Sequence, residues 1–276
     1  MTLSMASPTA RAALADALLK ARQAGTCLPL PTETHTAFSI EQAYGVADDI
    51  RRRRITAGEQ PRGYKIGFTN RGIWPKYGVH APIWGTVWDS TLTLLDGTDA
   101  TLSLAGLVQP RLEPEIVFCF ALTPRAGMSE AELVGCLAWV AHGVEVVHTH
   151  FEAWRFQAAD TVADFGLHGR LLVGPQVPIA AFTAPGRELA SLKLQLMRDG
   201  IEVDQGQGSL VLDGPLNALR LWVEAMAAQP QQWPIAPGDV VTTGTLTDAW
   251  PLVPGQRWHT RLSEPRLSGL NLAIEP

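Results

Sequence analysis

Two stretches near the start of the chain alternate polar and apolar residues with the period of an amphipathic helix. The first begins at Pro8, a residue that helices tolerate at their first position, and runs to about Gly25. The second begins at Ser39, and Gln42 follows three residues later in the spacing of a capping box. The pattern predicts a helical N-terminal cap over residues 1–62.

From Gly63 onward, short apolar runs alternate with glycine and proline. Apolar and polar residues alternate on both sides of Asp199-Gly200, a pattern typical of a β-hairpin. A capping box at Ser129 predicts a helix to about Ala141. The other predicted elements are strands at 87–95, 116–122, 144–147, 171–173, 239–243 and 258–262 and a helix at 215–228. Strands and helices do not alternate as in a doubly wound sheet, so the chain is predicted to be α+β. We predict a β-rich domain over 63–276, which would carry any catalytic site, although the whole chain could also behave as one domain, 1–276.

Composition narrows the class of protein. The 276 residues are 46% hydrophobic and 18% charged, which is enough to build a core, and the net charge of -5 argues against a nucleic-acid partner. The cationic run Arg51–Arg54 falls at a predicted helix end, where it interacts with the helix dipole and solvent. The three cysteines are odd in number and widely spaced, so a disulfide framework is not expected. The sequence also shows no signal-peptide core and no long apolar stretch. These features predict a cytoplasmic protein without a membrane span.

Three acidic residues fall at the start of, or inside, apolar strands. Glu113 and Glu115 stand two apart, so period-two geometry points both side chains to one face. Glu145 is embedded in an apolar run, which is costly unless the carboxylate is paired or binds a metal. Converging carboxylates suit a hard divalent ion. The alternatives are two solvated surface carboxylates and a lone buried acid paired with Lys or Arg.

Lys65 stands between glycines that let a ligand or the backbone approach closely. Beside a metal it could act as an acid–base group or bind a substrate carboxylate, and the alternative is a surface lysine on a turn. Asp160 and Asp164 could bind a substrate, support the metal ligands or cap a helix.

Three histidines cluster near this segment, at His148, His150 and His168. The spacing of the first two could suit zinc, but the sequence has no cysteine partner and no metalloprotease-type histidine motif. One histidine could face the substrate, while a polar role at a strand end is the alternative.

Taken together, these motifs resemble those of the 2-oxopent-4-enoate hydratase and 4-oxalocrotonate decarboxylase family, within the fumarylacetoacetate hydrolase superfamily. The matching blocks, in family order, are 63–69, 113–116, 144–146, 160–164, 238–241 and Gly244. The resemblance implies a mixed β-sandwich roll with peripheral helices. It also implies a homo-oligomer that acts on a small 2-oxo or 2-hydroxydienoic acid from aromatic catabolism. In such a protein Mg²⁺ or Mn²⁺ is held by Glu113, Glu115 and Glu145, with Lys65 at the reacting centre.

The chain departs from the family at two places. Ile83 stands where many hydratases carry an acid, and the segment after Asp164 has Phe165, Leu167 and His168 in place of Asn and Ser. If the missing acid normally activates water, another group must replace it or the enzyme does not hydrate its substrate. The nearest candidates in the sequence are His150 and His168, with His168 favoured, because a neutral imidazole accepts a proton near pH 7. The residues predicted to contact substrate are Ile83, Trp84, Asp160, Asp164, Phe165, Leu167 and Thr243.

The expected activity is metal-dependent hydration of a 2-hydroxy-2,4-dienoate to a 4-hydroxy-2-oxo acid. A bulkier, apolar pocket end at Phe165 and Leu167 favours a substrate with an uncharged tail. Three alternatives stay open: decarboxylation of a 2-oxo-3-hexenedioate-like acid, carbon–carbon bond hydrolysis of an acylpyruvate, and a metal-dependent binding protein without turnover.

Overall fold

The computed structural model of the chain describes residues 7–35 and 37–276. The helices are α1 (Pro8–Ala24), α2 (Pro31–Thr34), α3 (Ile40–Thr56), α4 (Trp74–Tyr77), α5 (Glu130–Val134), α6 (Ala158–Ala163), α7 (Pro185–Ser191) and α8 (Pro215–Ala228). The strands are β1 (Pro61–Gly67), β2 (Ile83–Trp88), β3 (Leu92–Leu94), β4 (Asp99–Leu102), β5 (Arg111–Phe120), β6 (Leu137–Val147), β7 (His168–Val173), β8 (Val177–Pro178), β9 (Lys193–Arg198), β10 (Ile201–Gln207), β11 (Val240–Thr245), β12 (Trp250–Pro251), β13 (Arg257–Leu262) and β14 (Asn271–Ile274).

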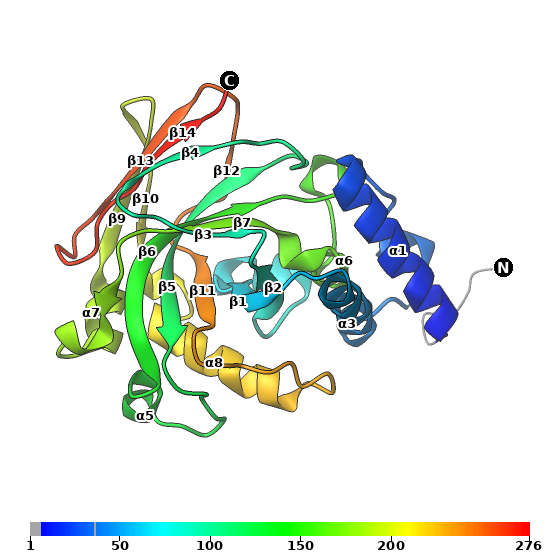
Figure 1. Cartoon of the computed structure of the whole chain (residues 1–276), viewed down its shortest axis with the longest axis horizontal. Coiled ribbons are helices and arrows are strands. Elements are labelled where there is room, and N and C mark those ends of the chain that lie inside the picture. The colour runs from blue at the N-terminus through cyan, green and yellow to red at the C-terminus, as the bar shows by residue number, and fades with distance from the viewer. Residues whose placement is uncertain (1–6, 36) are drawn as a thin grey trace.

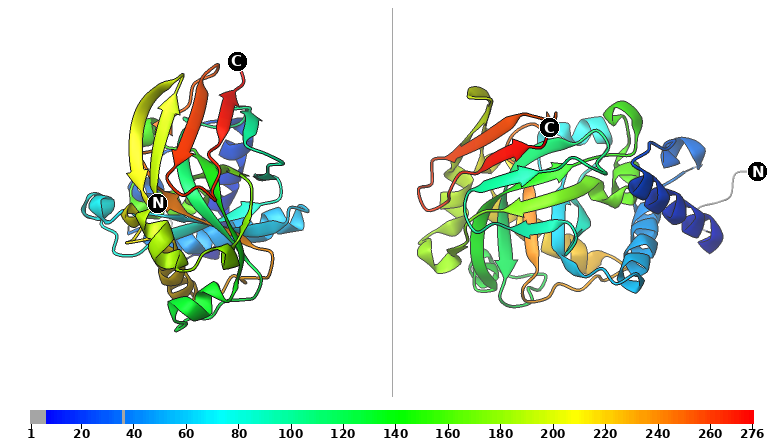
Figure 2. Two further views of the ribbon diagram at one scale, coloured as in Figure 1. Left: turned by 90° about the vertical axis from the view of Figure 1, so that its left-hand side faces the viewer. Right: turned by 45° about the horizontal axis from the view of Figure 1, so that its top comes forward.

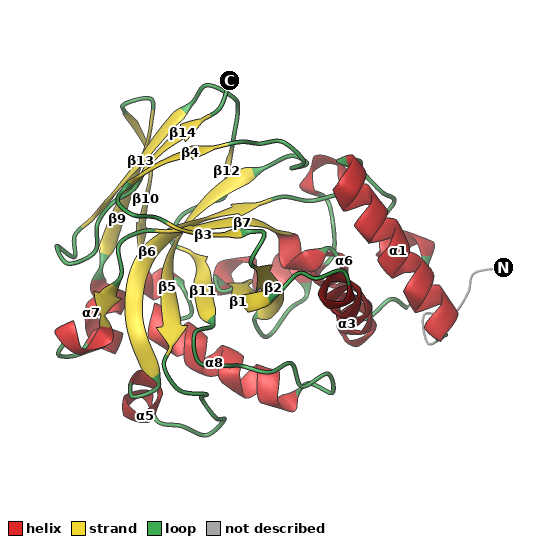
Figure 3. Cartoon of the chain, viewed as in Figure 1, coloured by secondary structure: helices red, strands yellow, loops and turns green. Residues whose placement is uncertain are grey.

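Two curled sheets form the body of the molecule (Figures 1 and 3). The larger sheet has nine strands. Seven of them follow the order β2-β1-β11-β5-β6-β7-β3, while β12 pairs with β5 and β8 pairs with β6. The smaller sheet has five strands in the order β10-β9-β13-β14-β4. Helices α1 and α3 lie at one end of the larger sheet and α8 lies along another side, as the rotated views also show (Figure 2). The predicted α+β roll with peripheral helices and a helical N-terminal segment is confirmed.

The N-terminal helices form as their end signals predict. Helix α1 has proline in its first turn and is capped at its C-terminus by Gly25, which adopts a left-handed conformation. The N-terminus of α3 is capped by the capping box of Ser39 and Gln42. Tyr44 of α3 packs on Trp84 with ring centroids 4.5 Å apart. Buried residues of both helices belong to the same hydrophobic cluster as those of the larger sheet, so residues 7–62 share its core.

The helix predicted from Ser129 to Ala141 is wrong in its length. The capping box forms, but α5 ends at Val134, and the chain continues as strand β6 from Leu137. Pairing of β6 with β5 along ten registered positions outweighs the local helix signal, because strand preference depends on tertiary context. The hairpin at Asp199 and helix α8 form as predicted.

The cysteines are all free thiols, with Cys27 exposed and Cys119 and Cys136 buried as core fillers. Within residues 7–35 and 37–276, none of the helices combines the length and the hydropathy needed to cross a bilayer.

Candidate active site

Strands β5 and β6 bring the three predicted carboxylates together. Glu113 lies directly opposite Glu145 in the antiparallel register, and Glu115 follows two residues later on the same face. One ligand atom from each side chain lies within 4.8 Å of the others. Glu115 and Glu145 are fully buried. Three acids meeting in a buried space repel each other unless protons or cations neutralise them.

Glu115 is oriented by strand β11. Its Oε2 accepts hydrogen bonds from the Thr242 hydroxyl and from the main-chain N–H of Gly244, the latter at 2.6 Å. Gly244 has φ near 104°, and a Cβ there would lie 1.9 Å from the Thr69 hydroxyl oxygen, so only glycine fits. The other oxygen, Oε1, is buried and has no hydrogen-bond partner among the described residues. Glu115 therefore presents one unpaired oxygen to the other carboxylates.

Lys65 of β1 reaches the carboxylates from the neighbouring part of the sheet. Its Nζ donates a hydrogen bond to the carbonyl of Gly166 at 3.0 Å and lies 3.2 Å from Glu145 Oε2, although the latter contact lacks hydrogen-bond geometry. Gly166 belongs to the turn 165–167, whose three residues all have positive φ. The turn lies against Gly85, where a Cβ would come within 2.4 Å of a turn carbonyl.

The ionisable groups of the site shift one another's pKa values. Burial raises the pKa of Glu113 to about 7, although Lys65 works against the shift. Burial and the neighbouring carboxylates also raise the pKa of Glu115 well above its usual value. Burial opposes ionisation of Glu145 too, but Lys65 and His168 outweigh it and lower its pKa. Burial alone would lower the pKa of Lys65, but Glu145 and the other two carboxylates outweigh it and raise the pKa.

This donor set fits a hard divalent cation. Three carboxylates converge, and two of their buried oxygens, Glu115 Oε1 and Glu145 Oε2, accept no hydrogen bond from any described residue. Oxygen ligands of this kind suit Mg²⁺ or Mn²⁺. A bound cation would satisfy both oxygens and remove the repulsion between the acids.

We expect the rise in melting temperature that Mg²⁺ causes to increase from about pH 5 to about pH 8. Because the pKa of Glu113 is raised to about 7, its carboxyl holds a proton in the metal-free fold below about pH 7. This protonation stabilises the metal-free fold at low pH and is lost as the pH rises through about 7, whereas the metal requires the carboxylate. Scanning calorimetry with and without Mg²⁺ measures the difference, and Glu113→Gln is the control. A Mg²⁺ effect independent of pH would contradict this expectation.

A cavity of about 250 Å³ opens beside the carboxylates. It is lined by residues that include Lys65, Glu113, Ile83, Leu167 and Gly166, whose carbonyl accepts the hydrogen bond from Lys65. Two larger hollows, of about 600 and 800 Å³, lie on the smaller sheet, where no cluster of acids is present in the described chain. The cavity at Lys65 is therefore the candidate active site, although it is smaller.

Some residues predicted to contact substrate face away from this cavity. Trp84 follows Ile83 on β2, so alternation turns it to the opposite side, where it packs on Tyr44. Thr243 donates from its hydroxyl to the carbonyl of Ile116 at 2.9 Å. Phe165 is the first residue of the turn 165–167, and its side chain is buried and does not line the cavity. A substrate contact for these residues stays a prediction that their placement does not favour.

The two aspartates, Asp160 and Asp164, form hydrogen bonds that connect separate segments of the chain outside the cavity. Asp160 accepts hydrogen bonds from the main-chain N–H and the hydroxyl of Thr32, at 2.9 and 2.8 Å. Asp164 is buried and bonds to His150 through Nδ1 at 2.5 Å and through the main-chain N–H at 2.9 Å. These contacts are those of structural residues, and neither aspartate lines the cavity.

Neither predicted catalytic histidine lines the cavity. His150 is fully buried on Asp164, and His168 is buried behind the carboxylates, with Nδ1 2.8 Å from Glu145 Oε1. His168 therefore lies at the metal centre but behind one of its ligands. Direct proton exchange between either imidazole and a substrate stays a prediction without support from the placement.

Several cavity residues were not singled out from the sequence. Arg111 precedes Glu113 by two positions on β5, so the same period-two argument would have placed it on the same face. Its guanidinium lies 4.2 Å above the ring of Trp154. Further cavity residues include Phe68, Asn70, Ile73, Lys76, Tyr77, Phe156 and Asp248. They come from loops and from short helical turns such as α4, and period-two reasoning gives no signal for them.

Several characterised bacterial enzymes are similar in sequence to this chain. The 2-hydroxyhexa-2,4-dienoate hydratase of Comamonas testosteroni is 31% identical over 239 residues, covering 86% of this chain and 87% of that protein. The 4-oxalocrotonate decarboxylase of Pseudomonas sp. strain CF600 is 27% identical over 235 residues, covering 85% of this chain and 86% of that protein. The chain belongs to the 2-oxopent-4-enoate hydratase and 4-oxalocrotonate decarboxylase family. No protein-family model matches it.

Solved structures agree with this family at the level of the fold. The 4-oxalocrotonate decarboxylase from Pseudomonas putida G7, complexed with magnesium and adipate, superposes with a TM-score of 0.88 at 23% identity, over 97% of this chain and 98% of that one. The fumarylpyruvate hydrolase from Pseudomonas aeruginosa, complexed with Mn²⁺ and pyruvate, has a TM-score of 0.60 at 13% identity, over 78% of this chain and 89% of that one. The fold of this family member is therefore that of the fumarylacetoacetate hydrolase superfamily.

Proposed function

We propose that this enzyme is a Mg²⁺-dependent hydratase that adds water to a 2-hydroxy-2,4-dienoate and gives a 4-hydroxy-2-oxo acid. The observation that carries the proposal is the meeting of Glu113, Glu115 and Glu145 with Lys65 at one cavity. Several relatives bear the names of hydratases for such dienoates. Mn²⁺ is an alternative ion for the same carboxylates.

In this proposal the three glutamates hold the metal and Lys65 carries the proton. When bound, Mg²⁺ supplies Lewis-acid stabilisation of the negative charge that develops on the substrate's O2. Lys65 Nζ faces the cavity from β1 and is held by the Gly166 carbonyl. A cation held by the three glutamates would offset the negative charge that raises the pKa of Lys65, so the neutral amine could take the O2 proton and return it to a substrate carbon. Ile83 and Leu167 cover part of the cavity and exclude bulk water from the reacting atoms.

The far part of the cavity supports a substrate with an uncharged tail. Tyr77 packs between Phe68 and Phe156, with ring centroids 5.0 and 5.8 Å away. Trp154 extends this aromatic wall and covers the guanidinium of Arg111. Apolar surface of this kind binds the alkyl or alkenyl end of a substrate.

A decarboxylase is the second candidate, because Ile83 lines the cavity at the position where many hydratases carry an acid. Decarboxylation of a 2-oxo-3-hexenedioate requires the same stabilised charge on O2 but no attacking water. In that reaction Lys76 and Arg111, the cations that line the outer cavity with Lys65, would bind the second carboxylate.

Comparison of substrates tests the proposal. With Mg²⁺ present, we expect loss of dienol absorbance without CO₂ release from 2-hydroxypenta-2,4-dienoate, and a higher kcat/KM for 2-hydroxyhexa-2,4-dienoate because its extra methyl group meets the aromatic wall. One buried methylene contributes roughly 1 kcal/mol, or several-fold in kcat/KM. CO₂ release from 2-oxo-3-hexenedioate would favour the decarboxylase, and pyruvate release from an acylpyruvate would favour the carbon–carbon hydrolase. Metal binding without turnover of any of them would leave a binding protein.

Homo-oligomer formation and a cytoplasmic location remain predictions, each implied by the resemblance and the sequence. Gel filtration with light scattering measures the first.

A further inference from the structure

The imidazole of His168 is bound at both of its nitrogens inside the protein. Nδ1 lies 2.8 Å from Oε1 of Glu145, and Nε2 lies 2.9 Å from the hydroxyl oxygen of Thr91. Both partners are buried, and His168 itself is 1% exposed. The ring therefore occupies a fixed position between the hydroxyl of Thr91 and the carboxylate of Glu145.

The partners determine which nitrogen carries the proton in the neutral ring. A carboxylate oxygen only accepts hydrogen bonds, so Nδ1 must be the donor toward Glu145. Nε2 then accepts a hydrogen bond from the Thr91 hydroxyl at 2.9 Å, a shorter contact than the 3.2 Å from that hydroxyl to its other acceptor, the Trp88 carbonyl. Thr91 is held in place because its oxygen also accepts from the main-chain N–H of Trp88 at 3.0 Å.

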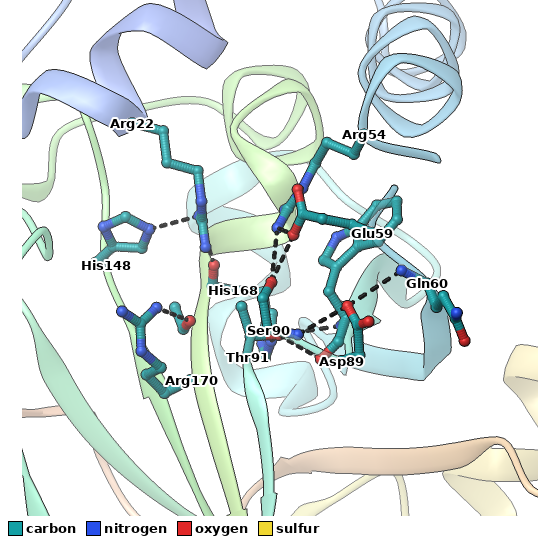
Figure 4. A network of polar contacts seen from close by, with 12 residues as sticks. Arg22, Arg54, Glu59, Gln60, Asp89, Ser90, Thr91, His148, His168 and Arg170 are labelled. Atoms are coloured by element: carbon teal, nitrogen blue, oxygen red, sulfur yellow. Dashed lines mark hydrogen bonds and ion pairs between the residues drawn. The ribbon is translucent and has the colours of Figure 1, made fainter. Parts of the chain in front are cut away.

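The main chain of His168 is fixed independently of its ring. Arg22, in the last turn of α1, donates from one guanidinium nitrogen to the His168 carbonyl at 2.9 Å, and the same nitrogen lies 2.9 Å from His148 Nε2 (Figure 4). Strand pairing places His168 opposite Val147. A change of side chain at position 168 therefore removes the ring contacts while these main-chain contacts remain.

Glu145 has one committed oxygen and one available oxygen. Oε1 is held by His168, whereas Oε2 has no hydrogen bond in the described chain and faces Lys65 at 3.2 Å. Without a donor on Oε1, the carboxylate could rotate about its last side-chain bond, and its buried charge would lose a hydrogen bond. Hydrogen-bond donors to ligating carboxylates orient the ligand in this way.

We propose that His168 is a positioning residue that, with Thr91, fixes Glu145 so that Oε2 points at the metal. The proposal rests on the metal site proposed above. It assigns to His168 a role through Glu145 and none in contact with substrate. The residue thereby replaces the small polar residue that the resemblance leads one to expect at this position, and it makes the metal centre depend on Thr91, which touches none of the three glutamates.

Binding of Mn²⁺ alone, followed by electron paramagnetic resonance and calorimetry without substrate, tests this role. We expect His168→Leu to weaken Mn²⁺ binding by about 10–100-fold, the loss typical of an outer hydrogen-bond partner of a metal ligand. His168→Asn, whose amide N–H can occupy the place of Nδ1, should restore most of the affinity. Thr91→Val should weaken binding in the same direction as His168→Leu, because it removes the donor that fixes the ring.

His142 provides a matched control. It is 1% exposed like His168, and its Nε2 likewise bonds to a threonine hydroxyl, that of Thr260, at 2.9 Å. Its Nδ1, however, contacts Glu115 only at the main-chain carbonyl, so His142→Leu should lower the melting temperature and leave Mn²⁺ affinity nearly unchanged. Equal losses of Mn²⁺ affinity in His142→Leu and His168→Leu would overturn the proposal, as would parental affinity in a folded His168→Leu protein.

Glu115→Gln separates this proposal from that of the metal site. If Glu115→Gln abolishes Mn²⁺ binding while His168→Leu leaves it intact, the metal site stands and the role of His168 fails. If neither variant changes Mn²⁺ binding, the metal site itself fails.

Discussion

Glu115→Gln is expected to remove most of the enzyme's affinity for Mg²⁺ while the fold stays intact. The Thr242 hydroxyl and the Gly244 N–H both donate to Oε2, so the amide oxygen of glutamine must take that place. The amide nitrogen then occupies the position of Oε1 and points donor hydrogens at the cation. The loss should exceed the roughly 10–100-fold typical of outer-shell partners, because a ligand is replaced by a donor.

The same substitution should cost little stability in the metal-free protein. Burial and the other carboxylates raise the pKa of Glu115 well above its usual value, which favours the neutral carboxyl, the form that an amide resembles. Calorimetric titration with Mg²⁺ and thermal unfolding of the metal-free variant measure the two effects. Glu130→Gln, on the exposed start of α5, is the control for loss of one carboxylate. Unchanged Mg²⁺ affinity in Glu115→Gln would exclude it as a ligand.

The sequence predicts the centre of the site better than its surroundings. Period-two spacing predicts that Glu113 and Glu115 share a face, and an acid inside an apolar strand marks Glu145; the structure brings all three together. The same rule, applied to β2, would have shown that Ile83 and Trp84 cannot both face one cavity. Strand alternation is therefore sufficient to predict which side chains of one strand share a face.

Long-range contacts explain the failures. Nothing near Asp160 in the sequence indicates that it bonds to Thr32, more than a hundred positions away. The position of His168 behind Glu145 likewise depends on how β6 pairs with β7, which is not visible in local composition. The end of α5 at Val134 results from the pairing of β6 with β5, and the capping box, which is local, was predicted correctly.

Lys65→Met should abolish turnover while Mg²⁺ binding and the fold are retained. Lys65 is 4% exposed, with its Nζ between the Gly166 carbonyl and Glu145, and methionine fills a similar volume. Removal of a positioned acid–base group typically lowers kcat by about 10²–10⁴-fold. Mg²⁺ affinity should not fall, because the variant loses a cation that repels Mg²⁺ from the three carboxylates.

Three measurements on the Lys65→Met protein distinguish a catalytic from a structural role: kcat on 2-hydroxypenta-2,4-dienoate, Mg²⁺ affinity by calorimetry, and the melting temperature with Mg²⁺ bound. Lys193→Met, on an exposed position of β9 in the smaller sheet, is the matched control and should keep parental values of all three. A kcat near that of the parent would exclude Lys65 as the group that moves the proton. Failure of the Mg²⁺-bound variant to fold would show that Lys65 serves mainly to neutralise the buried glutamates. Folded, Mg²⁺-bound protein without turnover is the result that a proton-carrying Lys65 requires.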